Sequence, residues 1–291
     1  MISGVKGSEK KAKEEQRPAD LKSTSQIADE AEQYLCAAVL RPGNVTAAVG
    51  ARGILRRLIN MISYSFPGAR IRVRLDGGFA HPDLLDFLDG ETNLEYVIAM
   101  AKNAVLKRKA KPAMRQARRL SRQSGKTEHV YGEANYAART WPQQRRILIK
   151  AEIVRAEGKK PKDNPRFVIT NMKQSSQWLY EEVYCQRGEI ENRIKELHDL
   201  QIDRTSCSDF WANQLRVLLT AAAYVLMQEL RLHAARTSCA RAQVWTLRER
   251  LLKLGARVLV SVRRVVVHLP ASFPFLTTFR QVALALGASP G

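Results

Sequence analysis

An α/β fold is predicted for this chain because strand-like and helix-like segments alternate along its ordered part. Short apolar runs typical of buried strands lie at residues 34–40, 71–75 and 96–100. Residues 46–62 have the apolar spacing of a helix, and "HPDLLDFL" then opens a second helix with Pro82 in its first turn. Strands that alternate with helices favour a layered α/β arrangement.

The pattern changes after residue 101 to a β-rich region and then to helices. Strand-like segments occur at "EHVYGEA", "RRILIKAEIV" and "RFVITNM", and we expect them to form a basic β-rich insertion, residues 102–171. The α/β core would consist of residues 34–101 and 172–236, with a C-terminal extension of helices and strands at 237–291. Helices are expected at about residues 175–200, 210–235, 241–254 and 275–286, with the strand-like "RVLVSVRRVVVHL" before the last of them.

The N-terminal segment, residues 1–33, is mixed in charge, poor in aromatic residues and without a sustained period. Such a composition buries too little apolar surface to offset the entropy that is lost on ordering. We therefore expect this segment to be mostly disordered. It also lacks the apolar core of a signal peptide, so no export is expected.

The chain is strongly basic, with 48 Lys and Arg against 28 Asp and Glu and a formal charge of +20. A compact body of this charge repels itself unless it meets a polyanion, so nucleic acid is the first partner to expect and an anionic membrane surface the second. Ten basic residues and no acidic one lie between Lys102 and Lys126. The residues of this run that we expect to bind DNA phosphates are Lys107, Arg108, Lys109, Arg115, Arg118 and Arg119.

Two other classes of protein are not favoured. The longest apolar run, residues 217–227, is too short to cross a bilayer and is typical of a buried helix. The four cysteines, Cys36, Cys185, Cys207 and Cys239, stand far apart, which favours reduced thiols over a disulfide frame or a zinc site. We expect a protein of the cytosol.

Asp76 is the first candidate for chemistry, because it directly follows the strand "IRVRL" and precedes two glycines that allow close approach of backbone or ligand. Carboxylates at the C-terminal ends of strands in α/β sheets often face the ligand crevice. The alternative is that Asp76 caps the next helix. The local sequence leaves both interpretations open.

A second candidate is the polar face Tyr184, Arg187, Glu191, Lys195 and His198. On one continuous helix these residues would lie within roughly 80° of one another. The face could be a solvated stripe of charged pairs. Alternatively, Glu191 is held ionised between two cations and binds a divalent ion, while the cations grip phosphate. A strand-end Asp and a later helical Glu in a basic protein fit a magnesium site for phosphodiester chemistry.

The sequence resembles the DDE transposases of bacterial insertion sequences, especially the insertion-sequence 1380 group. The resemblance rests on "LRPGN", "RVRLDGGF", "YVIAMAKN", "NPRFVITNM", "YCQRGEIENRIKE", "DRTSCSDFWANQLRVLLTAAAYVLMQELR" and "GARVLVSVRRVVVHL", and it runs from about Tyr34 to Gly287. It implies a ribonuclease-H-like catalytic core with a β-rich insertion and a helical C-terminal part. It also implies DNA as the partner, Mg²⁺ or Mn²⁺ as the cofactor, cleavage and strand transfer as the reaction, and a homodimer on DNA in the bacterial cytoplasm, associated with the nucleoid.

The resemblance also implies roles for single residues. Asp76 would be the second catalytic Asp and Glu191 the final Glu, both as metal ligands. Tyr184 and Arg187 match the family's Tyr-Arg-Glu-Lys pattern, whereas His198 occupies its lysine position, and Lys195 could stand in for that lysine. Trp141, in the insertion, has two possible roles. It would either pack against a displaced DNA base or be a simple core residue.

One departure concerns the first catalytic Asp, which the family places on the opening strand of its sheet. We expect no such strand here, because Asp20 and Asp29, the aspartates ahead of Tyr34, lie in a polar segment without an apolar run. The core would then be incomplete at its N-terminus, and Met1 would begin a truncated copy whose first 33 residues are not transposase sequence. A catalytically dead protein that binds DNA, or a pseudogene product without function, are the alternatives to an active enzyme.

Overall fold

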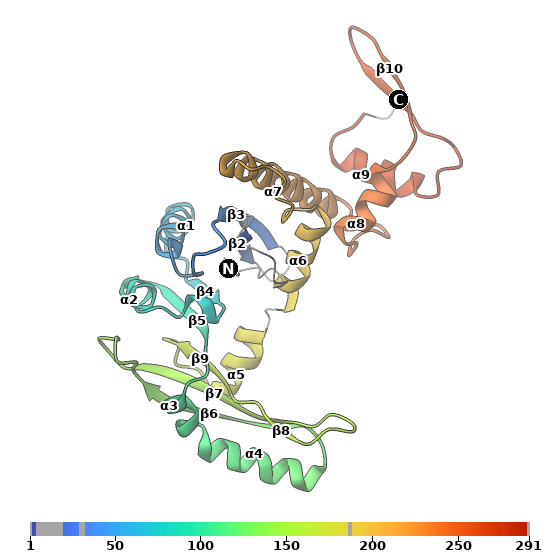
Figure 1. Ribbon diagram of the computed structural model, residues 1–291. Helices are drawn as coiled ribbons and strands as arrows, with labels where there is room; N and C mark the ends of the chain where they lie inside the picture. Colours follow the sequence, from blue (N-terminus) through green and yellow to red (C-terminus); the bar gives the residue numbers. More distant parts are fainter. Residues whose placement is uncertain (1, 4–19, 29–32, 186–187, 290–291) are drawn as a thin grey trace. The chain divides into compact units, whose positions relative to one another are not determined.

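The computed structural model describes residues 2–3, 20–28, 33–185 and 188–289 (Figure 1). The chain divides into two compact units. The first unit comprises Met1–Gln26 and Arg41–Glu189, and the second comprises Ile27–Leu40 and Ile190–Gly291. Strands and helices occur together in the described residues, which confirms the predicted α/β class.

The first unit is built on one sheet. Its described strands are β1 (Ile2–Ser3), β2 (Asp20–Ala28), β4 (Ile71–Leu75), β5 (Leu94–Met100), β6 (Glu128–Tyr136), β7 (Arg145–Val154), β8 (Lys162–Asp163) and β9 (Arg166–Thr170). They follow the order β2-β1-β4-β5-β9-β7-β6, with β8 beside β7. β4 is parallel to β1 and β5, whereas β6, β7, β8 and β9 pair antiparallel. The three strands predicted for the insertion, β6, β7 and β9, therefore extend the sheet of the core.

Helices cover one face of this sheet. They are α1 (Ala51–Ser65), α2 (Pro82–Gly90), α3 (Ala104–Lys109) and α4 (Lys111–Ser124), and Figure 1 shows α4 running along β6 and β7. Successive strand residues point to opposite faces, so Ile147 and Ile149 of β7 join Leu88 of α2 and Met114 of α4 in the main core. Leu148, between those two isoleucines, lies in a second cluster on the other face. The sheet is thus buried on both sides at β7.

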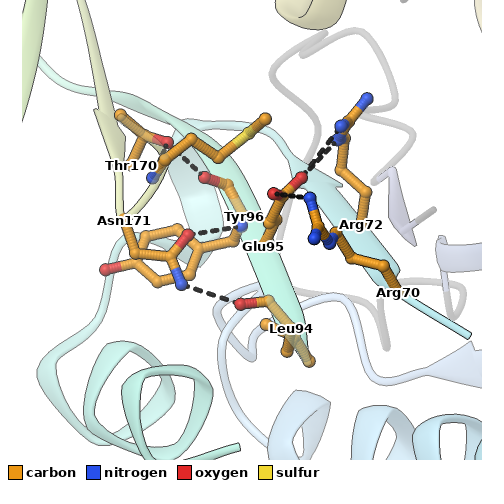
Figure 2. Close-up of polar contacts among 8 residues, drawn as sticks. Arg70, Arg72, Leu94, Glu95, Tyr96, Thr170 and Asn171 are labelled. Carbon is orange, nitrogen blue, oxygen red and sulfur yellow. Dashed lines mark hydrogen bonds and ion pairs between the residues drawn. The ribbon is translucent and has the colours of Figure 1, made fainter. Parts of the chain in front are cut away.

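Polar contacts hold β5 between its neighbours (Figure 2). The carboxylate of Glu95 accepts hydrogen bonds from Arg72 at 2.8 and 3.1 Å and from Arg70 at 3.3 Å, which links β5 to β4. On the other side, the Asn171 amide accepts from the Tyr96 backbone N–H at 2.9 Å and donates to the Leu94 carbonyl at 2.8 Å. Asn171 follows β9 directly, so its side chain continues the β5–β9 pairing after the strand has ended.

The structure differs from the expectation for residues 1–33 at the residues that it describes there. β1 and β2 are strands, and β1 lies between β2 and β4, whereas no opening strand was expected. Ile2 pairs with Leu75, and Ser3 pairs with Thr24. Pairing in a sheet uses backbone N–H and C=O groups, so a polar segment can join it without an apolar run of its own. Asp20 opens β2, and Asp29 lies outside the described residues.

The helix expected at residues 175–200 is not α-helical throughout. The structure has α5 (Ser176–Trp178), a π-helical segment η2 (Leu179–Tyr184) and, after residues 186–187, which lie outside the described residues, α6 (Gly188–Asp199). π-helices bond i→i+5 and so turn by a smaller angle per residue than α-helices, and glycine at the start of α6 has low helix propensity. Residues 186–187 lie outside the described residues, and Tyr184 and Glu191 belong to different units, so their common face stays a prediction.

The second unit is mainly helical. Besides α6 it contains β3 (Gln33–Arg41) up to Leu40, α7 (Phe210–His233), α8 (Val244–Leu247), the π-helical η4 (Arg248–Leu252), the hairpin β10 (Arg257–Val260) and β11 (Val265–His268), and α9 (Leu276–Ala285). α7 contacts both α8 and α9. The basic helix predicted at 241–254 is shorter and becomes π-helical at Arg248. In the described residues, no helix combines the length and the apolar character needed to span a bilayer.

Candidate active site and DNA-binding surface

Asp76 leaves the end of β4 with extended backbone and caps the short helix η1 (Gly77–Phe79). Its Oδ1 accepts a hydrogen bond from the backbone N–H of Gly78 at 2.8 Å. The capping interpretation is therefore confirmed, and it fixes one oxygen of a half-exposed carboxylate at the C-terminal end of a strand. Oδ2 takes no part in the cap, so capping and ligand binding are compatible at this residue.

The end of η2 is surrounded by rings and cations. The rings of Tyr184 and Tyr180 have centroids 5.3 Å apart, and the Tyr180 ring lies 5.6 Å from that of Tyr131. Lys150 Nζ lies 5.6 Å from the Tyr180 ring centroid. Tyr184 is half-buried here, whereas Arg187 lies outside the described residues.

Three cations near the end of η2 were not predicted from the sequence: Arg74 on β4, Lys150 on β7 and Arg166 on β9. Burial raises the pKa of the Cys185 thiol, and the positive charges of all three cations oppose that increase, so they act on the end of η2 together. Alternation along each strand could have predicted which face of the sheet its cation occupies, because residues two positions apart point to the same face. Only the strand pairing shows that these three strands bring the cations to one region.

Glu152 is a half-buried carboxylate beside two of these cations, Lys150 and Arg166, and it accepts hydrogen bonds from Lys150 and from Asn164 at 2.7 Å. Burial alone would raise the pKa of Glu152, but those hydrogen bonds and the charges of Lys150 and Arg166 hold it below its ordinary value. A carboxyl with a lowered pKa stabilises the fold above its unfolded pKa, and this contribution is lost as pH falls through the folded pKa.

Replacement of Glu152 by Gln is therefore expected to reduce the loss of stability between pH 7 and an acidic pH below the ordinary glutamate pKa of about 4.3. Urea unfolding midpoints at the two pH values measure this difference. The exposed Glu157 provides the matched control, Glu157→Gln. If the stability of the wild type and of the Glu152 variant depended equally on pH, the lowered pKa of Glu152 would be contradicted.

On α6, the exposed face carries Glu191 and Lys195, four residues apart. His198 lies on the same face, half-buried, with its Nδ1 3.2 Å from Asp203 Oδ2. Glu196 points to the opposite side and is 2% exposed. The structure thus brings three of the five predicted residues together on one helix of the second unit, and places Tyr184 in the first unit.

Asp76 of the first unit and Glu191 of the second unit each carry a carboxylate, the kind of oxygen ligand that suits a magnesium ion. Mg²⁺ prefers oxygen ligands and is usually held by one or two carboxylates, with waters and substrate phosphates completing its shell. Within the described residues, no group of three or more His, Cys, Asp and Glu side chains is placed to hold a metal. The described part of β1, Ile2–Ser3, contains no carboxylate.

The basic run of residues 102–126 forms α3 and α4, and its charges face outward. Leu106, Ala110, Met114, Ala117 and Ser121 are buried against the sheet. The predicted phosphate-binding residues Lys107, Arg108, Lys109, Arg115, Arg118 and Arg119 are all exposed. Arg118 also donates to Asp163 of β8. The result is a helical surface with cations on its solvent side.

Trp141 lies in the main core and is 9% exposed. Its ring meets Tyr136 edge-on at 5.3 Å, and the Arg145 guanidinium lies 5.2 Å from the ring centroid. Arg145 is itself held by Asp89, whose Oδ2 accepts from Nε at 2.7 Å, and by Asp86. These contacts agree with the interpretation of Trp141 as a core residue.

A sequence model of DDE transposase domains matches residues 27–290 of the chain. Because the match covers most of its length, the chain belongs to the family described as Transposase DDE domain group 1. The match begins inside the segment 1–33 that we expected to lie outside the family sequence. A comparison with curated proteins gave no match. DNA is the partner that a transposase domain implies.

Proposed function

We propose that this chain is a transposase of an insertion sequence of the insertion-sequence 1380 group, and that it cleaves DNA at the ends of the element and joins them to a target. The membership of the DDE family supports this function. The observation that carries it is the half-exposed carboxylate of Asp76 at the end of β4. The order β2-β1-β4-β5, with β1 parallel to β4 and antiparallel to β2, supports a ribonuclease-H-like core.

In this proposal Asp76 and Glu191 hold a divalent cation, Mg²⁺ or Mn²⁺. When bound, such an ion activates the attacking oxygen and stabilises the leaving oxygen of a phosphodiester. The other residues of the pattern bind and orient the DNA. Lys195 and Arg187 contribute positive charge to a phosphate, and Tyr184 and His198 contribute hydrogen-bonding groups.

The exposed surface of α3 and α4 is proposed to follow the DNA backbone. Each cation that neutralises a phosphate releases condensed counterions, so binding weakens as salt increases. The surface is matched to this role because its buried residues face the sheet and its cations face solvent. Assembly as a dimer on two DNA ends, in the bacterial cytoplasm near the nucleoid, is part of the same proposal.

Replacement of Arg115 and Arg119 by Gln is expected to weaken DNA binding by an amount that shrinks at high salt. The slope of log K against log salt concentration should become shallower by about 0.9 for each phosphate that is no longer neutralised, or about 1.8 for the pair. Fluorescence anisotropy with a labelled duplex at several salt concentrations measures this slope. Arg204→Gln, an exposed arginine of the second unit, is the control and should leave the slope unchanged. An unchanged slope in the double variant would remove α4 from the DNA-binding surface.

The function itself is tested by incubating the purified full chain with supercoiled plasmid and Mn²⁺ or Mg²⁺. The expected result is metal-dependent nicking that a chelator abolishes. A folded chain that binds DNA with steep salt dependence but never nicks it would be a DNA-binding protein only, and the enzymatic part of the proposal would be wrong.

A further inference from the structure

Arg41 is a buried cation held by backbone carbonyl groups. Its side chain donates to the carbonyl oxygens of Ala47 at 2.8 Å and Thr46 at 3.0 Å, and also to that of Val49. The residue is 6% exposed, and burial lowers the pKa of its guanidinium. A buried charge is costly unless polar groups replace its hydration, so the carbonyl groups must be held in place around the guanidinium.

The loop that Arg41 holds packs directly on the turn after β4. A Cβ atom added at Gly78 would lie 3.0 Å from the Cβ of Ala47 and 3.1 Å from Oδ1 of Asp76. Such distances are tighter than ordinary contacts, so a side chain at position 78 would require Ala47 or the Asp76 carboxylate to shift by a few tenths of an ångström. The backbone N–H of this same Gly78 is the group that donates to Asp76 Oδ1.

Phe79 fixes the turn from the other side. It is fully buried, in the main core, and its N–H bonds to the Asp76 carbonyl at 3.2 Å. The turn is thus held between Phe79 in the core and Ala47 in the loop. A shift of the loop would move Ala47, and with it the Gly78 N–H that orients the Asp76 carboxylate.

We propose that Arg41 is a positioning residue for Asp76, acting through the loop of residues 42–49 and Gly78. The effect on metal binding rests on the proposed function, in which Asp76 is a metal ligand. The effect on the orientation of Asp76 does not. Groups that hydrogen-bond to metal ligands typically change metal affinity or activity by about 10- to 100-fold when they are removed.

The test uses the full chain with Arg41→Met, labelled with ¹⁵N-glycine so that only its 16 glycines give amide signals. Gly78→Ala identifies the signal of Gly78 by its loss. In Arg41→Met, the Gly78 amide should change its chemical shift and exchange with solvent about tenfold faster, because its carboxylate acceptor is no longer held. The Mn²⁺ concentration for half-maximal nicking should rise about tenfold, with a much smaller change at saturating metal.

Arg70→Met is the matched control, because Arg70 is an exposed arginine on the same unit whose side chain bonds to Glu95 and is remote in sequence from the Arg41 loop. It should leave both readouts unchanged. Gly78→Ala should raise the metal requirement as Arg41→Met does, because the added methyl group displaces the loop or the carboxylate.

If Arg41→Met does not fold, Arg41→Lys decides the question, because one ammonium group keeps the charge but lacks the fork that reaches several carbonyl groups. It should show the same two changes, smaller in size. An unchanged Gly78 amide in a folded Arg41 variant would overturn the proposal. If the wild type never nicks DNA, the proposed function fails, and the amide signal still decides whether Arg41 positions Asp76.

Discussion

Asp76→Asn and Glu191→Gln are each expected to reduce metal-dependent nicking about 1,000-fold, because a bound cation contributes several kcal/mol and about 1.36 kcal/mol is a factor of ten in rate. An amide keeps the size of the carboxyl group but loses the charge that binds a hard cation. Asp76→Asn retains an oxygen that can accept from Gly78, so the cap at η1 should survive. Glu191 is exposed on α6, so its replacement should not disturb the fold.

These variants separate catalysis from DNA binding. Plasmid nicking at saturating Mn²⁺ gives the rate, and anisotropy with a labelled duplex gives the affinity, which should change little. Asp83→Asn is the control, because Asp83 is an exposed carboxylate at the start of α2, close to Asp76 in sequence. Full nicking activity in Asp76→Asn or in Glu191→Gln would remove that residue from the catalytic centre.

Loss of the Glu196 carboxylate is expected to have the largest effect on stability. Its Oε1 accepts from Arg231 at 2.5 Å and from the Val244 N–H at 3.3 Å, and its Oε2 accepts from the Tyr224 hydroxyl at 3.0 Å and Arg193 at 3.1 Å. This carboxylate therefore joins α6, α7 and α8 of the second unit. Glu196→Leu would leave the buried Arg231 without its counter-charge, which costs about 3–5 kcal/mol.

Urea unfolding followed by circular dichroism measures this loss. Glu249→Gln removes a carboxylate from an exposed pair with Lys253 in the same unit, and it should change the free energy of unfolding by less than about 1 kcal/mol. The double variant Glu196→Leu with Arg231→Met should be more stable than Glu196→Leu alone, because it no longer buries an unpaired charge. Equal stability of Glu196→Leu and the wild type would contradict the role of this carboxylate.

The strands of the first unit could be predicted where side-chain alternation is regular. β4 and β7 have the bounds expected from the sequence, because apolar residues recur at every second position and the flanking residues break the pattern. β1 and β2 could not be predicted, because the pairing of β1 with β2 and with β4 depends on backbone groups that composition does not reveal. The change from α-helix to π-helix at Leu179 was missed because the helical pattern of the sequence runs through it.

The residues of the candidate site also divide into those that local sequence features predict and those that they do not. Asp76 could be predicted because its strand, its position after that strand and the following glycines are all local features. From its sequence neighbours, Glu196 looks like an exposed charge on a solvated helix. Its burial depends on partners 28, 35 and 48 residues away in the sequence, which no local pattern reveals. Arg41 was likewise not predicted, because the carbonyl groups that it holds belong to a loop whose path no side-chain pattern specifies.

In the proposed function, Asp76 and Glu191 bind the same divalent cation. Ferrous iron can replace magnesium and, with ascorbate and peroxide, produces hydroxyl radicals that cut the polypeptide next to the bound ion. Fragment masses from the full chain with bound DNA would locate the cuts. Cuts are expected within a few residues of both Asp76 and Glu191, and Asp76→Asn should abolish both. Cuts at only one of the two residues, or cuts near Glu191 that persist in Asp76→Asn, would contradict it.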